Sequence, residues 1–232
     1  MVYSEVVDNY KRISDKIENA RIKAGRTDKI RLMAVTKTVD VQKINFAISQ
    51  GIDLVGENRV QELLSKYDEM DKTAEIHLIG TLQTNKVKYI CDKVSMIQSV
   101  DSIKLATEIN KRCEKISKVM DVLLEVNIGR EESKGGFSPE QLNSAIGELL
   151  SLPNIRLRGL MTIPPFGEGE KYFPEMYKLY VDNSVKKVDN RSNDNFKWDT
   201  LSMGMSDDFE EAIQNGANIV RIGSALFGKR IY

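Results

Sequence analysis

The segment Arg31-Leu32-Met33-Ala34-Val35-Thr36-Lys37 is an apolar run of strand length that ends on a lysine. Partial burial at the end of a strand disfavours the charged ammonium form of a lysine, and the neutral amine can form a Schiff base. A lysine in this position is more often a solvated loop residue, so the segment alone does not assign it a role. It predicts the first strand of the fold, with Lys37 as a candidate nucleophile at its end.

A second informative segment, Asn218 to Gly228, lies near the other end of the chain, where an apolar strand runs into Gly223, Ser224 and a short helical pattern. Backbone N–H groups at a glycine turn and a helix start point outward without partners, and the helix dipole favours an anion there. A Schiff-base lysine on the first strand and an anion site after the last strand suggest a phosphorylated aldehyde held between them. Pyridoxal 5'-phosphate (PLP) is the natural candidate.

Strand and helix patterns alternate between these two segments. The predicted strands cover 31–37, 52–56, 75–80, 94–100, 121–127, 155–161, 198–203 and 218–222. The predicted helices cover 5–24, with Ser4 as a candidate N-cap, and then 41–50, 58–70, 83–91, 103–118, 139–150, 172–188 and 207–215. A polar segment at 189–195 is expected to be an exposed loop. Eight alternations over 232 residues favour an α/β fold with one domain over residues 1–232, a (β/α)8 TIM barrel, above an open doubly wound sheet.

Composition argues against several classes of function. Lysine plus arginine number 34, as do aspartate plus glutamate, so the net charge is about zero. The chain therefore lacks the excess positive charge that would favour binding to nucleic acid or to an anionic membrane. No segment approaches the ~18 apolar residues of a membrane span, and the N-terminal residues show no apolar run, so we expect a cytoplasmic protein. Cys91 and Cys113 lack a close partner in sequence and are expected to be buried free thiols. A single histidine, His77, rules out a multi-histidine metal site, and we predict no metal.

Because the active site of such a barrel forms at the carboxyl ends of its strands, the residues that end each predicted strand are the candidate site. They comprise one lysine, one arginine and several small polar groups, without the facing pair of carboxylates that a glycosidase needs. These residues are Lys37, Glu57, Asn58, Gly80, Gln98, Asn127, Met161, Thr162, the segment 202–206, Arg221, Gly223 and Ser224.

Five motifs along the chain resemble a known family as a set. They are Val35-Thr36-Lys37, the segment 56–62 (GENRVQE), His77-Leu78-Ile79-Gly80 with Leu82-Gln83 and Asn85-Lys86, the segment 201–206 (LSMGMS), and Val220-Arg221-Ile222-Gly223. Together they closely resemble the pyridoxal phosphate homeostasis protein family, which is related to the barrel domain of alanine racemase, a fold type III PLP-binding barrel. The resemblance spans the whole chain, and the main departure is Ile76, where the family usually has an aromatic residue.

The resemblance implies that PLP is bound covalently as an aldimine to Lys37. Arg221 would face the pyridine nitrogen, and a permanent cation there weakens the ring as an electron sink. The phosphate would be bound by Ser206, Gly223 and Ser224, and the ring would lie along Asn58, Met161 and Met205. Packing in the barrel core is an equal alternative for Met161 and Met205, and capping of the next helix is one for Asn58. Glu57, Arg59 and His77 could equally form a structural polar network and are not counted among the catalytic residues.

Two functions follow from a PLP site. The first is a carrier without catalytic residues, which holds or buffers PLP for vitamin B6 homeostasis and delivers it to PLP-dependent apoenzymes or B6-salvage enzymes, as a monomer or weak homodimer. The alternative is an amino-acid racemase, which needs a second base. In alanine racemase that base is a tyrosine from a partner subunit, beside a further β-rich domain. Here the sequence ends at Tyr232, just after the last barrel element, and no tyrosine falls in a strand-end motif, so the carrier is favoured.

A third possibility is an aldolase that uses Lys37 directly, without a cofactor. It would require a phosphorylated substrate to explain Arg221 and the anion site. An absorption spectrum separates this possibility from the other two, because a PLP Schiff base absorbs near the visible.

Overall fold

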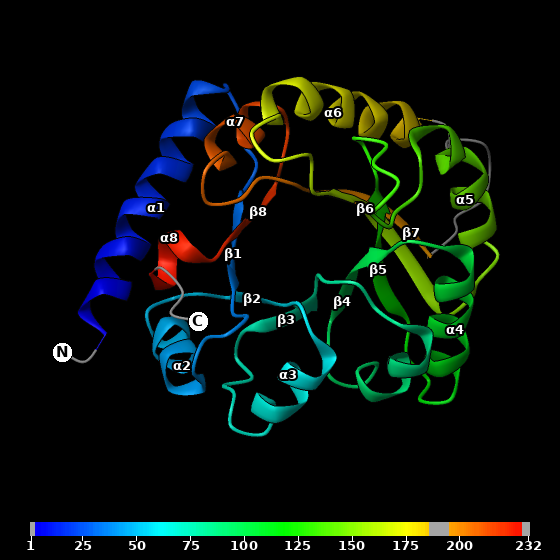
Figure 1. Ribbon diagram of the computed structural model, residues 1–232, viewed down its shortest axis with the longest axis horizontal. Coiled ribbons are helices and arrows are strands. Elements are labelled where there is room, and N and C mark those ends of the chain that lie inside the picture. The colour runs from blue at the N-terminus through cyan, green and yellow to red at the C-terminus, as the bar shows by residue number, and fades with distance from the viewer. Residues whose placement is uncertain (1–2, 186–194, 229–232) are drawn as a thin grey trace.

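The computed structural model describes residues 3–185 and 195–228, and its strands form a closed parallel barrel in chain order (Figure 1). The first strand pairs with both the second and the last, which closes the barrel. The strands are β1 Arg31–Val35, β2 Leu54–Glu57, β3 Glu75–Leu78, β4 Met96–Val100, β5 Met120–Val126, β6 Ile155–Thr162, β7 Phe196–Ser202 and β8 Ile219–Ile222. The predicted (β/α)8 barrel is therefore confirmed.

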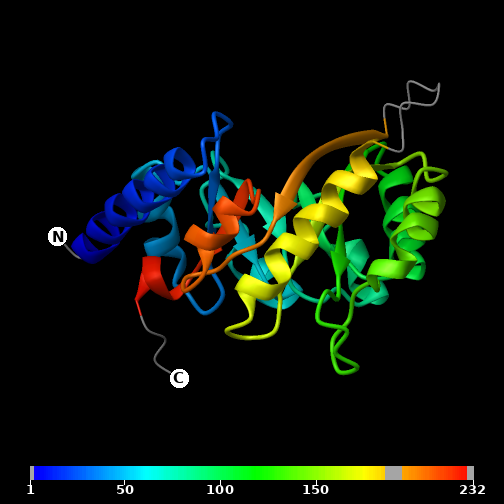
Figure 2. The same ribbon diagram turned by 90° about the horizontal axis from the view of Figure 1, so that it is seen from above.

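Helices surround the barrel on its outside (Figure 2). The α-helices are α1 Ser4–Lys23, α2 Val41–Ser49, α3 Val60–Lys66, α4 Ile103–Glu114, α5 Leu142–Leu149, α6 Gly169–Val185, α7 Phe209–Gln214 and α8 Ser224–Phe227. Two 3-10 helices, η1 Thr84–Tyr89 and η2 Pro139–Gln141, complete the described elements. The helix α1 precedes the first strand, so it is an addition to the alternating strands and helices. It lies beside α7 and α8.

Two sequence predictions of local structure need correction, and a third concerns residues that lie mostly outside the described part of the chain. The predicted helix at 83–91 is the 3-10 helix η1, whose single buried residue, Val87, offers little apolar surface to support an α-helix. Ser4 does not cap α1: it is the first helical residue, and Tyr3 occupies the N-cap position without a side-chain hydrogen bond. The expected loop at 189–195 lies outside the described residues except for Asn195.

Alternation along the strands divides the apolar side chains between two layers. Ala34 belongs to the large core between barrel and helices, whereas its neighbours Met33 and Val35 belong to a small cluster in the barrel interior. A second interior cluster consists of Met96, Leu123 and Met161. Polar side chains fill the rest of the interior, and this polar filling positions the site.

The two cysteines are free and buried, as expected, but they are not isolated. Packing of η1 against α4 brings the Cys91 and Cys113 thiols close enough that each shifts the pKa of the other. These residues are 22 positions apart in sequence and meet through tertiary packing that sequence spacing does not reveal. Within residues 3–185 and 195–228, no helix is long and apolar enough to cross a membrane, and no cluster of metal-ligating side chains occurs.

Candidate functional site

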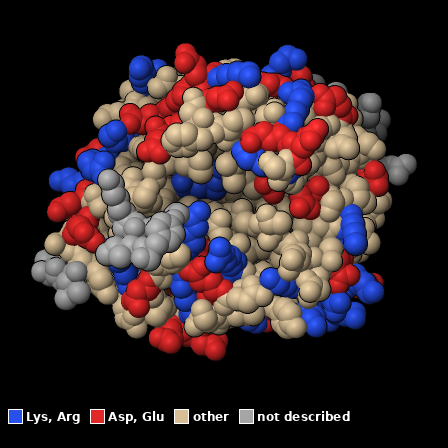
Figure 3. Space-filling model, in the orientation of Figure 1, with Lys and Arg blue, Asp and Glu red and all other residues tan. Residues whose placement is uncertain are grey.

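A cavity of about 180 Å³ opens at the carboxyl ends of β1 and β8. The face of the molecule seen in Figure 3 is hollowed near its middle, and lysine and arginine atoms lie within that hollow. Seven of the eight residues predicted to hold the cofactor line the cavity: Lys37, Asn58, Met205, Ser206, Arg221, Gly223 and Ser224. The remaining lining residues are Val35, Ile79, Ile163 and Asp207.

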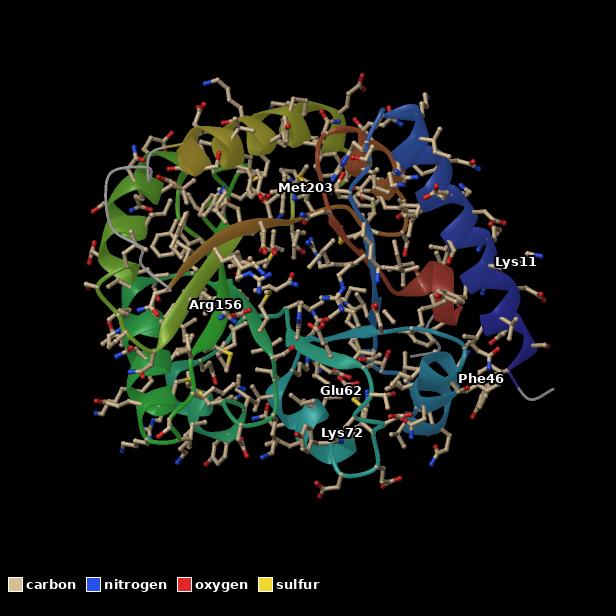
Figure 4. All side chains as sticks on the ribbon, turned by 180° about the vertical axis from the view of Figure 1, so that it is seen from behind. Lys11, Phe46, Glu62, Lys72, Arg156 and Met203 are labelled. Carbon is tan, nitrogen blue, oxygen red and sulfur yellow. The ribbon has the colours of Figure 1, made fainter. Side chains whose placement is uncertain are left out.

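The backbone on both sides of Lys37 is held by side chains of α3. The Lys66 ammonium donates to the Thr36 carbonyl at 2.9 Å, and the Thr38 N–H donates to the carboxylate of Glu62, which is labelled in Figure 4. Thr38 has a φ of +63°, an unusual conformation for a β-branched residue, and forms a turn with Lys37 just after β1. This turn places the half-buried Lys37 at the cavity wall.

Glu57 supports the same turn through hydrogen bonds to Thr36 and Lys66. Its Oε1 accepts hydrogen bonds from Thr36 Oγ1 at 2.5 Å and from Lys66 Nζ at 3.3 Å. Burial raises the pKa of Glu57, against the lowering effect of these partners. Glu57 does not line the cavity and bonds to Thr36 and Lys66, which agrees with the structural alternative left open for it.

Arg221 is buried, and its guanidinium is fixed by two hydrogen bonds. Nη1 donates to Ser202 Oγ at 2.9 Å, and Nη2 donates to the Thr162 carbonyl at 2.7 Å. Burial lowers the pKa of Arg221 to about 10, so the group is a cation at neutral pH. Glu125 faces it from the end of β5, and burial together with Asp101 raises the pKa of that carboxyl to about 7.

The loops after β7 and β8 bring two hydroxyl groups together. Ser224 Oγ donates to Ser206 Oγ at 3.3 Å, and the backbone N–H of Ala225 donates to the same Ser206 oxygen at 3.3 Å. Gly204, with a φ of +89°, permits the turn that carries Ser206, because a Cβ there would lie 2.5 Å from the Ala212 side chain. Neutral donors at the start of α8 suit an anionic group.

Asn58 presents an unsatisfied polar atom. Its Oδ1 is buried and has no hydrogen-bond partner, a costly arrangement that a donor on a bound molecule would relieve. Gly80 makes room for this residue, because a Cβ at position 80 would lie 2.3 Å from the Asn58 carbonyl oxygen. The alternative role as a helix cap is not seen: Arg59 occupies the N-cap position of α3, without a side-chain cap.

The other predicted residues lie away from the cavity lining. Met161 is fully buried against Met96 and Leu123, which agrees with the core-packing alternative left open for it. His77 is buried in the barrel and bonds to Gln98 and Glu75, which agrees with the structural alternative left open for it. Sequence reasoning named Thr162, Ser202 and Gln98 only as residues near strand ends and missed their relation to Arg221, for which no sequence motif exists.

The fold and the placement of these side chains define the class of the protein: a (β/α)8 barrel with a lysine after its first strand, an arginine on its last and two serine hydroxyls beside them. The family described as alanine racemase, N-terminal domain, matches residues 9–230. A pyridoxal phosphate homeostasis protein of Aquifex aeolicus is 46% identical over 224 residues, which cover 95% of this chain and 96% of the relative. The chain belongs to the pyridoxal phosphate homeostasis protein family.

Two solved structures are informative neighbours. PipY of Synechococcus elongatus, in a structure with PLP bound, has a TM-score of 0.79 and 27% identity, with 96% of this chain and all of that chain covered. Alanine racemase of Clostridium difficile has a TM-score of 0.71 at 19% identity, and the match covers 97% of this chain but 57% of the racemase. The second likeness concerns the fold alone.

Proposed function

We propose that this chain binds PLP reversibly as a Schiff base on Lys37 and thereby buffers PLP and delivers it within the cell. The observation that carries the proposal is one cavity that joins Lys37 and Arg221 to the paired hydroxyls of Ser206 and Ser224, beside the unpartnered Asn58 Oδ1. Attachment requires Lys37 Nζ to attack the aldehyde carbon, with formation of a C=N bond and loss of one water. The names of the relatives support the same function.

Each lining residue has a defined part in this proposal. Ser206, Gly223 and Ser224 hold the phosphate by hydroxyl and backbone donors, and Arg221 faces the ring nitrogen. Asn58 and Met205 lie along the ring. PLP supplies a reactive aldehyde and an electron-withdrawing ring, and a cation facing the nitrogen keeps that nitrogen unprotonated, which weakens electron withdrawal.

The racemase alternative is less well supported. A two-base racemase needs an acid or base on each face of the ring, and the cavity lining contains neither tyrosine nor histidine among the described residues. An open site with one lysine suits exchange of PLP better than carbanion chemistry. Transfer to apoenzymes or B6-salvage enzymes, a monomeric or weakly dimeric state, and a cytoplasmic location remain parts of the proposal.

The first test is the absorption spectrum of the purified chain after incubation with PLP and removal of excess. We expect a band near the visible that disappears on borohydride reduction. A chain that stays colourless yet forms a Schiff base with a phosphorylated aldehyde substrate would contradict the proposal and support an aldolase.

We expect negligible racemisation by the PLP-bound protein. The holoprotein is incubated with single enantiomers of alanine and serine in deuterated water, and exchange at the α-carbon is followed by NMR. Turnover at about 1 s⁻¹ or faster, within the ordinary range of enzymes, would reject the carrier in favour of the racemase.

Replacement Arg221→Ala is expected to weaken PLP retention while the barrel stays folded. Loss of one charge-assisted hydrogen bond costs about 1.5–3 kcal/mol, or roughly tenfold or more in affinity. Equilibrium dialysis gives the affinity and circular dichroism checks the fold. Arg12→Ala, on the exposed face of α1, carries the same change of charge as a control. Equal affinity in all three proteins would show that Arg221 does not reach the ring.

A further inference from the structure

A continuous chain of hydrogen bonds runs through the barrel behind Arg221. Arg221 Nη1 lies 2.9 Å from Ser202 Oγ, and that oxygen lies 2.7 Å from Gln98 Oε1. Gln98 Nε2 lies 2.9 Å from His77 Nδ1, and His77 Nε2 lies 3.3 Å from Glu75 Oε2. Arg221 is 3% exposed, His77 1%, and Ser202 and Gln98 are fully buried, so water does not compete for the bonds among these four residues.

The directions of the bonds follow from the guanidinium, which can only donate, and from the orientation of the Gln98 amide, whose oxygen faces Ser202. Ser202 accepts from Arg221 and gives its own proton to the Gln98 amide oxygen. The amide NH₂ of Gln98 then faces His77 Nδ1, which must be the unprotonated ring nitrogen. The single proton of a neutral His77 is thereby placed on Nε2 and directed at the Glu75 carboxylate.

The hydrogen-bonded series ends at Glu75, which lies at the opposite mouth of the barrel. Glu75 pairs with Arg31 at 3.1 Å, and both line a cavity of about 280 Å³ with His77. Arg156, which Figure 4 labels on β6, pairs at 2.6 Å with Asp121 of the same lining. The hydrogen bond from His77 holds the pKa of Glu75 down at about 2, so the end of the chain remains a carboxylate.

We propose that Ser202 and Gln98 are positioning residues that hold the Arg221 guanidinium toward the cofactor ring, with their hydrogen-bond directions locked by His77 and Glu75. The inference takes its ligand, PLP, from the proposed function. The direction of the hydrogen bonds from Arg221 to Glu75, in contrast, is a property of the protein alone. A buried arginine with a rigid acceptor keeps one orientation, whereas one without that acceptor must find another partner.

The first experiment reads the tautomer of His77 in the cofactor-free protein by nitrogen NMR of the imidazole. The chain has one histidine, so the signals need no assignment. Burial lowers the pKa of His77, against Glu75 and Asp121, which raise it, while Arg31 lowers it further. We expect a neutral ring with its proton on Nε2 at pH 7. A proton on Nδ1 would overturn the proposal, because it reverses the chain.

The second experiment uses the variant Gln98→Glu, which replaces the donor to His77 Nδ1 with an acceptor. His77 should then carry both protons, and its pKa should rise by roughly one to three units, as beside any new opposite charge. The carboxylate still accepts from Ser202, so PLP affinity should stay within about threefold of the parent, whereas Gln98→Leu should lose about tenfold. Equal affinity in Gln98→Leu and the parent would overturn the positioning role.

The third comparison is between two buried serines, Ser202 on β7 and Ser99 on β4. Ser202→Ala removes one of the two acceptors of Arg221, whereas Ser99→Ala removes a 2.8 Å bond to the Gly80 carbonyl and leaves the hydrogen bonds behind Arg221 intact. We expect Ser202→Ala alone to weaken PLP binding about tenfold and to shift the absorption maximum of the bound cofactor. Identical spectra for both variants would contradict the proposal.

These experiments separate the two proposals. A parent protein that binds no PLP would reject the proposed function, while the His77 tautomer would still decide the direction of the chain. A parent that binds PLP normally, with the ring proton on Nδ1, would retain the function and reject the positioning residues.

Discussion

Replacing Lys37 with alanine is expected to abolish the covalent adduct with PLP, because no other lysine lines the cavity among the described residues. Borohydride reduction of the parent followed by peptide mapping should place the pyridoxyl mass on Lys37, and in Lys37→Ala the labelling should fall to background. The anion cradle and Arg221 remain in the variant. Weak, non-covalent binding should therefore persist, detectable by dialysis.

Lys86→Ala is the matched control. Lys86 is a half-buried lysine on η1 whose ammonium contacts Gln61 at 3.3 Å, outside the cavity lining. It should retain full labelling on Lys37. A pyridoxyl mass on Lys86 or Lys134 in the parent protein would overturn the assignment of the Schiff base.

The barrel could be predicted because its signals are local and repeated. Each strand is a short apolar run and each helix has its own periodicity, so an error in one element leaves the alternation intact. The 3-10 helix η1 shows the limit: a single buried residue, Val87, leaves too little pattern to choose between helix types. Strand ends could also be predicted, and with them the candidate residues Lys37 and Arg221.

What lies around those residues could not be predicted, because it depends on which side chains meet across the barrel. Met161 ends one predicted strand and Met205 comes shortly after another. The register of β6 places Met161 in the interior cluster, whereas the loop after β7 places Met205 at the cavity. The Cys91–Cys113 contact likewise arises from packing. The bond from Ser202 to Gln98 joins residues 104 positions apart, a separation at which one sequence gives no signal.

Glu125 is a further group whose behaviour depends on packing, and it controls a predicted pH dependence of stability. Burial raises its pKa from the ordinary 4.5 to about 7; Asp101 adds to that rise and Arg221 opposes it. The folded protein thus keeps a proton on Glu125 that the unfolded chain releases near pH 4.5. Stability from this group is full below pH 4.5 and is lost as the pH rises toward 7, by at most about 3 kcal/mol.

Glu125→Gln removes this loss, since the amide mimics the protonated carboxyl at every pH. Relative to the parent, the free energy of unfolding of Glu125→Gln should therefore rise between pH 4.5 and pH 8 by up to about 3 kcal/mol, as measured by urea denaturation at a series of pH values. Glu132→Gln, an exposed site on the following loop, controls for the change in net charge and should follow the parent. If the parent and Glu125→Gln instead change in parallel across this range, the carboxyl is ionised in the folded protein. Arg221 would then be held by an ion pair with Glu125 as well as by Ser202 and Thr162.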